Sequence, residues 1–166
     1  MDLGSGPEVK IFIAHRGLTT GPNERWENHP DQIRQTLAAG FDCEIDVRLI
    51  DNRWLLGHDQ AQYEVDTDFL MLTGLWIHCK NHDALANIGR IGEVHSTWHQ
   101  PTHFWHQSDD YTLTSNGFIW TYPGKPVDPQ VGICVQPEWD KNWKPAPNSV
   151  DGVGVCSKFV KIIKGT

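Results

Sequence analysis

Residues 41–59 read FDCEIDVRLIDNRWLLGHD, and they place two acidic side chains, Glu44 and Asp46, inside an otherwise apolar run. The aliphatic and β-branched composition of residues 42–50 predicts a buried strand. Because side chains alternate across a strand, the two acids point to one face while Ile45 between them points to the other. Two bare buried carboxylates repel each other and are costly to desolvate. The pattern therefore predicts a positive charge between them.

Strands and helices alternate on both sides of this segment. A short extended piece is expected over residues 54–58, after a turn. Helices are predicted from about Pro30 to just before Gly40, with Asn28 as the N-cap, and over residues 82–90. β-Branched and aromatic runs predict strands at residues 10–17, 42–50, 75–81, 103–107, 117–124, 131–139 and 150–160.

The order strand, helix, strand, helix at the front predicts a parallel sheet of βα units. Continuous apolar strands fit a sheet that is covered on both faces. A TIM barrel typically needs roughly 250 residues, whereas this chain has 166. We therefore expect one α/β domain over residues 1–166, a trimmed TIM-barrel-like fold with few helices in its C-terminal half.

Composition excludes several classes of partner and location. The formal charge of −7 gives no broad attraction to nucleic acid. No apolar run approaches the roughly 20 residues that a membrane span requires, and the polar N-terminus lacks the apolar core of a signal peptide, so the cytoplasm is expected. The cysteines form no CxxC pair and predict reduced, buried thiols: Cys43, Cys79, Cys134 and Cys156.

Polar side chains gather where the predicted strands end. His15 and Arg16 end the first strand, His58 follows the second, and His78 and Lys80 share one face near the end of the third. In a parallel barrel these ends form one rim, where active sites lie.

On its spacing alone, the pair Glu44 and Asp46 would be explained by salt bridges to Arg16, Arg48 or Lys80. The polar residues at equivalent positions on successive strands favour a functional site instead. Oxygen ligands at this spacing suit a hard divalent cation such as Mg²⁺ or Ca²⁺.

The order IAHRG, EN at Glu27-Asn28, EIDVRL, GHD and a strand ending in Lys80 resembles the glycerophosphodiester phosphodiesterase family, a group of phospholipase-C-like enzymes with a TIM-barrel fold. The match covers roughly residues 10–81. GFIWTYPG and VDGVGVCSKFV extend it weakly into the C-terminal half.

The resemblance implies a metal-dependent hydrolase of a glycerophosphodiester or another small or lipid-derived phosphodiester. By position it implies that His15 and His58 are the catalytic histidine pair and that Glu44 and Asp46 are metal ligands. Arg16 and Lys80 would bind the phosphate oxygens. Glu27 would position the substrate or His15, and Trp120 would line the mouth. Which histidine is the acid and which the base stays open.

Two features depart from the family pattern. His78 occupies a position where the family has an acidic metal ligand. With His78 as third ligand, the site would prefer Mn²⁺ or Zn²⁺ or would hold its metal weakly. Alternatively, it would recruit another acid such as Asp109 or Asp110. The family's insertion after GHD is nearly absent, which predicts an open mouth.

Two alternatives to hydrolysis remain. With the same histidines, a lyase would form a cyclic phosphate. A non-catalytic barrel would bind a phosphate ligand or a partner protein; His78 favours it, and the presence of His15 and His58 opposes it. An oligomer that pairs through exposed strands is compatible with the sequence.

The segment HFWHQSDDYTLTSNGFIWTYPG is rich in aromatics. Trp105, Trp120 and Tyr122 either line the substrate mouth or cover the barrel where helices are missing. His95 and His99, just before this segment, are expected on the surface.

Overall fold

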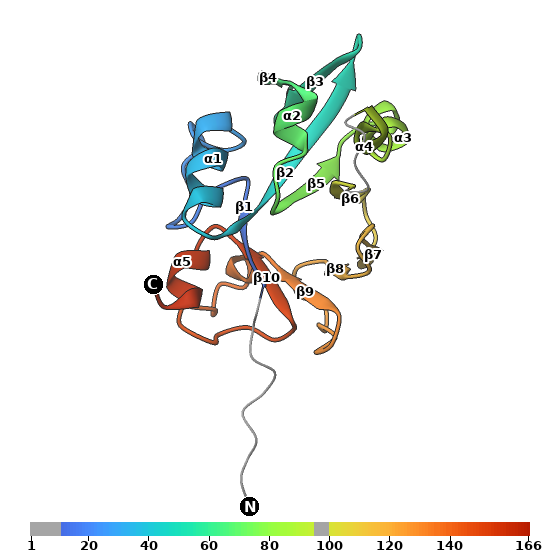
Figure 1. The fold of residues 1–166 in the computed structure, drawn as a ribbon. Helices are drawn as coiled ribbons and strands as arrows, with labels where there is room; N and C mark the ends of the chain where they lie inside the picture. Colours follow the sequence, from blue (N-terminus) through green and yellow to red (C-terminus); the bar gives the residue numbers. More distant parts are fainter. Residues whose placement is uncertain (1–10, 95–99) are drawn as a thin grey trace, which may run out of the picture.

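The structure is a computed structural model that describes residues 11–94 and 100–166, and its described strands form one ten-stranded sheet (Figure 1). The parallel strands follow one another in the order β6 (Thr102–Phe104), β5 (Leu75–Cys79), β2 (Asp42–Ile50), β1 (Ile11–His15), β10 (Gly154–Ser157), β9 (Gly132–Val135) and β8 (Ile119–Thr121). Antiparallel strands extend it: β3 (Arg53–Leu56), β4 (Tyr63–Val65) and β7 (Tyr111–Leu113).

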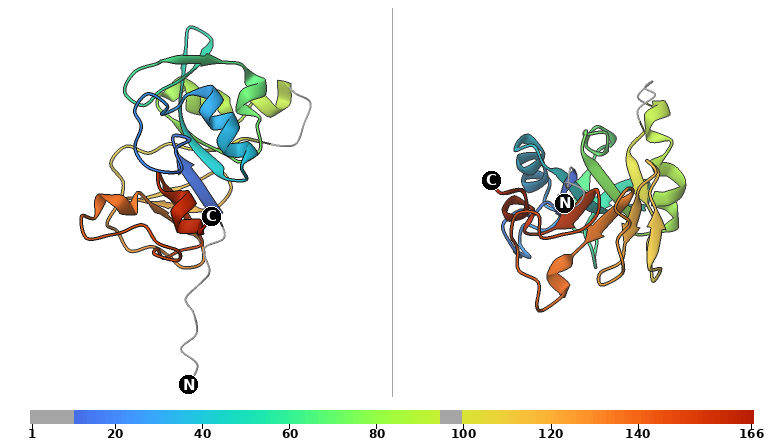
Figure 2. Two further views of the ribbon diagram at one scale, coloured as in Figure 1. Left: turned by 90° about the vertical axis from the view of Figure 1, so that its left-hand side faces the viewer. Right: turned by 90° about the horizontal axis from the view of Figure 1, so that it is seen from below.

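The sheet curls but does not close. Seen end-on in Figure 2 (right), its strands curve around a common axis. Among the described residues no ladder joins β6 to β8; His103 instead exchanges 2.9 Å hydrogen bonds with the backbone and hydroxyl of Ser115. The fold is therefore mixed α/β and compatible with a barrel-like architecture, but it is not a closed TIM barrel. The second edge of β8 is occupied by the antiparallel strand β7, so β6 cannot pair with β8 to complete a parallel ring.

Helices concentrate in the N-terminal half, as the sequence predicts. They are α1 (Pro30–Ala38), α2 (Thr67–Leu70), α3 (His82–Ile88), α4 (Ile91–Val94) and the C-terminal α5 (Val160–Lys164). Between β6 and β10 the only helical element of the described chain is the 3-10 turn η1 (Pro137–Trp139). Figure 1 shows α1 and α5 on one flank and α3 and α4 on the other. Nowhere in residues 11–94 and 100–166 is there a helix with the length and apolarity to cross a membrane.

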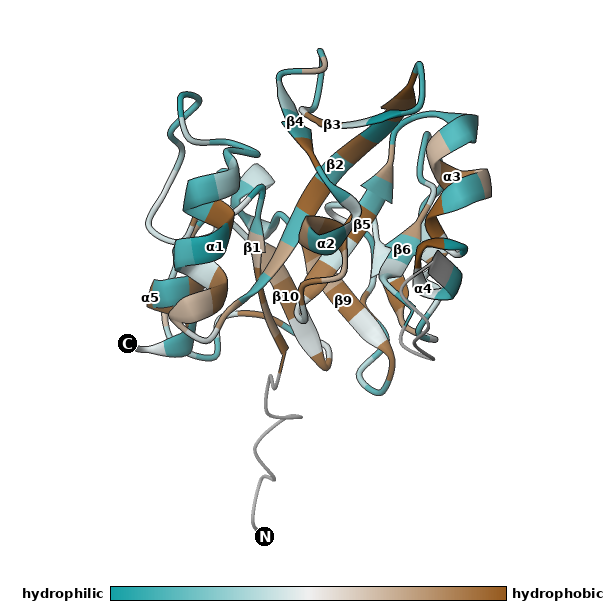
Figure 3. Ribbon diagram, turned by 45° about the horizontal axis from the view of Figure 1, so that its top comes forward, coloured by the Kyte–Doolittle hydropathy of each residue, from teal (hydrophilic) through white to brown (hydrophobic). Residues whose placement is uncertain are grey.

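Apolar side chains fill both sides of the sheet. Cys43, Ile45 and Val47 point to the face of the sheet opposite the acids, as predicted for Ile45. They are fully buried and pack with Ile33 of α1 and Ala84 of α3. The brown strands and inner helix faces of Figure 3 show this layer. A second cluster occupies the opposite face and forms the floor beneath the strand ends: Ile13, Trp76, Phe104, Trp120, Ile133, Val135 and Cys156.

Three of the four cysteines are buried as predicted, Cys43, Cys79 and Cys156, whereas Cys134 is only partly buried. Burial raises the pKa of the Cys79 thiol to about 12, so this group is unreactive at neutral pH.

The N-cap prediction is wrong by one residue. His29, not Asn28, caps α1, since its Nδ1 accepts the backbone N–H of Asp31 at 3.2 Å. Asn28 adopts a left-handed conformation with φ of 56°, which turns its amide away from the helix and toward β2.

Candidate active site

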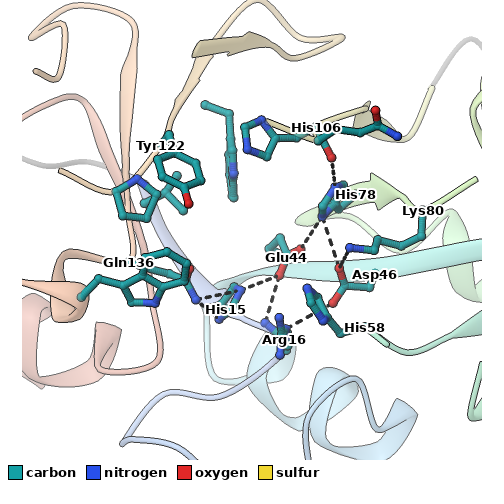
Figure 4. A pocket seen from close by; sticks show the side chains of 15 residues that line it. His15, Arg16, Glu44, Asp46, His58, His78, Lys80, His106, Tyr122 and Gln136 are labelled. Carbon is teal, nitrogen blue, oxygen red and sulfur yellow. Dashed lines mark hydrogen bonds and ion pairs between the residues drawn. The ribbon is translucent and has the colours of Figure 1, made fainter. Parts of the chain in front are cut away.

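A pocket of about 300 Å³ opens at the C-terminal ends of β1, β2 and β5, where the sequence predicts the site (Figure 4). Every predicted site residue except Glu27 lines it. Its full lining is His15, Arg16, Glu44, Asp46, His58, His78, Lys80, His106, Gln107, Trp120, Tyr122, Pro123, Val135, Gln136 and Trp139.

Asp46 is the centre of the polar network. It is 1 % exposed, and its Oδ2 lies 3.2 Å from Nε of Arg16. Its Oδ1 lies 3.2 Å from Nδ1 of His78 and 3.7 Å from Nζ of Lys80. Among the described residues this buried Oδ1 has no partner with hydrogen-bond geometry. An anionic oxygen left in this state is costly, so it is suited to a further positive ligand.

His78 presents a lone pair to the two acids. Its Nε2 lies 3.1 Å from the backbone carbonyl of His106, which can only accept, so Nε2 carries the proton of the neutral ring. Its Nδ1 then faces Oδ1 of Asp46 and, at 3.8 Å, Oε1 of Glu44. Three electron-rich atoms thus converge on one point and require a proton or a metal ion between them.

These residues fit a divalent metal. Glu44, Asp46 and His78 each offer one ligand atom, and the three atoms lie within 4.8 Å of one another. One imidazole nitrogen beside two carboxylates suits Mn²⁺ or Zn²⁺ better than a set made only of oxygens does, while Mg²⁺ and Ca²⁺ remain compatible with the acids.

The two acids have opposite pKa shifts. Burial and the neighbouring charge of Asp46 raise the pKa of Glu44. Burial alone would also raise the pKa of Asp46, but a proton held between its Oδ1 and Nδ1 of His78 in the absence of a metal, together with the charges of Arg16 and Lys80, outweighs it and holds that pKa well below its ordinary range. One acid is therefore ionised by its neighbours, and a bound cation would favour the ionised form of the other.

Asn28 holds Asp46 in place. Its Nδ2 donates to Oδ2 of Asp46, and its Oδ1 accepts the backbone N–H of Asp46, both at 2.9 Å. This pair of hydrogen bonds fixes the Asp46 carboxylate on β2 from the loop before α1. The sequence pattern predicted Asn28 as the helix cap and gave no signal for this role.

Glu27 lies outside the pocket lining and contacts cations rather than His15. Its carboxylate accepts from Arg16 at 2.6 Å and also pairs with Lys158, at the end of β10. Burial opposes ionisation of Glu27, but these two partners lower its pKa. Glu27 therefore positions Arg16, and Lys158 is a site residue that the sequence analysis missed.

The two predicted catalytic histidines line the same pocket in different surroundings. His15 is 6 % exposed, with its Nε2 3.7 Å from Oε2 of Glu44. Burial, followed by the charge of Arg16, lowers the pKa of His15 well below its ordinary value, so the ring is neutral at pH 7. The side chain of His58 is 38 % exposed, and its Nδ1 lies 2.7 Å from Oδ1 of Asp59.

Arg48 does not pair with the acids, although it is a candidate partner by sequence. Its guanidinium donates to the backbone carbonyls of Gly57 and, at 2.5 Å, of His58. It therefore fixes the segment that carries the second histidine.

The aromatic predictions divide. Trp120 and Tyr122 line the pocket. Trp105 instead packs against His82 of α3, with ring centroids 4.9 Å apart and planes tilted by 36°, and it adjoins the helix-side core, so it covers the sheet. The exposed Asp109 and Asp110 are not among the pocket-lining residues.

Asp110 pairs with Lys125 at 2.9 Å, away from the proposed ligands. His95 and His99 lie outside the described residues. Four further residues line the pocket without having been predicted from the sequence: His106, Gln107, Gln136 and Trp139. For Gln136 and Trp139 the signal was Pro137, which cannot continue a ladder and so ends the strand at the rim.

Three of the six described non-glycine residues with positive φ lie in or beside the pocket. Arg16, Asn28 and Gln136 have φ values of 54°, 56° and 46°, in the left-handed region that costs a non-glycine residue about 1 kcal/mol or more. The side-chain amide nitrogen of Gln136, Nε2, lies 3.1 Å from Nδ1 and 3.3 Å from Nε2 of His15. The strained residues thus each contact another pocket residue.

Comparisons of the chain with family models, with curated proteins and with solved structures return no match. The geometry of the site is therefore the basis on which a function is inferred.

Proposed function

We propose that the protein is a metal-dependent phosphodiester hydrolase that acts on a glycerophosphodiester-like or other small phosphodiester. The observation that carries the proposal is the convergence of the His78 Nδ1 lone pair, Glu44 and the unsatisfied Oδ1 of Asp46 on one point. The scaffold would be a trimmed TIM-barrel-like fold. The expected cytoplasmic location stays a prediction.

Glu44, Asp46 and His78 would hold the metal ion. When bound, a divalent ion screens the phosphate charge and polarises the phosphoryl oxygen. Arg16 and Lys80 add positive charge on the same side of the pocket. Together these groups would offset the negative charge with which a phosphodiester repels nucleophiles.

The histidines would move the protons. His15, neutral at pH 7, accepts a proton from the attacking water as the new P–O bond forms. His58, whose Nδ1 is held by Asp59, gives a proton to the alkoxide oxygen as the old P–O bond breaks. Proton transfer of this kind accelerates a reaction roughly 10²–10⁴-fold per group.

The direct test is turnover of bis(p-nitrophenyl) phosphate with Mn²⁺, Mg²⁺, Ca²⁺ or Zn²⁺ and with EDTA. We expect metal-dependent activity that EDTA removes and that His15→Ala lowers about 10²-fold or more. His82→Ala, an exposed histidine outside the pocket, is the matched control and should keep full activity.

Three outcomes would contradict the proposal. Activity that survives both EDTA and His15→Ala would remove the mechanism. No turnover with any metal would favour a non-catalytic phosphate-binding protein, which the existing ion pairs of Asp46 with Arg16 and Lys80 would allow. With glycerophosphocholine as substrate, a persistent cyclic product in phosphorus NMR would indicate a lyase.

A further inference from the structure

Two aromatic rings form a corner on the side of the pocket opposite the metal-binding acids. Tyr122 and Trp139 lie with centroids 6.0 Å apart and planes at 89°. Trp139 is 58 % exposed, although it lines the pocket. Figure 4 shows Tyr122 across the pocket from Lys80 and His58. We call Tyr122 and Trp139 the aromatic corner.

The corner is held rigidly. Trp139 ends η1, and its backbone N–H donates to the carbonyl of Gln136 at 3.0 Å. The neighbouring Glu138 carboxylate accepts from the hydroxyl of Ser157 at 2.9 Å and from the backbone N–H of Lys158 at 3.0 Å. These bonds fasten the turn to the end of β10. The exposed indole is therefore presented by a fixed turn, and a fixed exposed aromatic beside a polar pocket is typical of a binding site.

The same turn contacts the proposed reaction centre. Gln136, which precedes η1, places its amide nitrogen within 3.1 Å of His15. A group that stacks in the corner would thus lie directly beside the phosphate that His15 faces.

We propose that the aromatic corner is a subsite for a planar ring carried by one alcohol of the phosphodiester; this rests on the proposed function for its phosphate anchor. Two perpendicular rings offer a flat group one face to stack on and one edge to meet. A flexible acyl chain would need a long apolar channel, whereas the side of the pocket facing the corner is charged and carries Lys80, His58 and the acids. Stacking on an aromatic side chain strengthens binding roughly 5- to 100-fold.

Calorimetric titration in the presence of Mn²⁺ tests the proposal without turnover. The probes are phenyl phosphate, n-hexyl phosphate, phosphocholine and glycerol 3-phosphate. Phenyl phosphate should bind about tenfold tighter than glycerol 3-phosphate. Trp139→Ala should reduce that preference to about twofold or less, and it should fold because the side chain is exposed. Tyr111→Ala removes an aromatic of similar exposure outside the pocket and should keep the preference.

The outcomes separate the subsite from the proposed function. If phenyl phosphate binds no tighter than glycerol 3-phosphate, the subsite is overturned while the phosphate anchor stands. Hexyl phosphate binding as tightly as phenyl phosphate would show an acyl site, and phosphocholine binding tightest would show a cation site; either overturns the planar-ring proposal. If none of the four binds, the anchor itself fails, and the proposed function fails with the subsite.

Discussion

The two sides of the pocket are built differently. Its charged side stands on β1, β2 and β5, strands of five to nine residues backed by α1 and α3. Its aromatic side stands on β8, β9 and η1, where strands have three or four residues and no described α-helix intervenes. The contrast teaches that buried charges are placed by longer strands backed by helices, whereas an exposed aromatic pair can be presented by short strands and turns.

The largest effect should come from the charged side. Glu44→Gln removes a carboxylate that is 2 % exposed and one proposed metal ligand. Metal ions contribute several kcal/mol to transition-state stabilisation, so turnover of bis(p-nitrophenyl) phosphate should fall roughly 10³-fold, and the rise in melting temperature on adding Mn²⁺ should disappear. Glu64→Gln, in an exposed pair with Arg53, is the control; equal losses in both variants would contradict the assignment.

The next largest effect, on the free energy of unfolding, should come from the apolar layers beneath the two sides of the pocket. Ile45 and Ile133 are both fully buried, the first against the helices and the second in the floor. Replacing either by Ala should lower the free energy of unfolding by about 2–5 kcal/mol, measured by urea denaturation. We expect the larger loss at Ile45, because the short strands around Ile133 can relax into the cavity. The reverse order would show that the C-terminal half is the rigid one.

A smaller, pH-dependent effect should come from Glu27, which joins the two sides through Arg16 and Lys158. Its folded pKa lies below the ordinary value of 4.5, so its stabilisation is fully present above that pH and is lost as the pH falls through the folded pKa. Glu27→Gln should cost about 1–2 kcal/mol at pH 7 after allowance for solvent screening. In denaturation curves at a series of pH values, the difference from wild type should vanish near the folded pKa. A difference that is independent of pH would contradict the ion-pair account.

The smallest effect should lie at the outer edge of the aromatic side. Leu113 of β7 is 73 % exposed, so Leu113→Lys should change the free energy of unfolding by no more than about 0.5 kcal/mol. A larger loss in urea denaturation would show that the edge of β7 is covered in solution, as an oligomer that pairs through exposed strands requires.

Sequence patterns predicted the charged side well. The alternation around Ile45 placed both acids on one face, and the strand ends brought His15, His58 and Lys80 to one pocket. These predictions hold because strand alternation and the parallel order of βα units are properties of the local chain.

The aromatic side was predicted less well, for identifiable reasons. The strand expected over residues 131–139 ends at Val135, and Pro137 begins η1 because proline cannot donate to a ladder. The expected strand over residues 150–160 ends at Ser157, and α5 follows.

Four elements of three or four residues, β4, α2, α4 and β7, were not predicted. Elements this short depend on tertiary packing rather than on a periodic pattern. The contact between Asn28 and Asp46, 18 residues apart, likewise has no signal in spacing.

The side-chain amide of Asn28 also bears on how such sites could be found in other chains. An acidic residue two positions after another is common by chance, and its direction is set here by a loop asparagine with a left-handed backbone. A chain that kept both acids but replaced the asparagine would retain the signature while losing the two hydrogen bonds that orient the second carboxylate. A search for proteins with this chemistry should therefore weigh the asparagine as heavily as the acids.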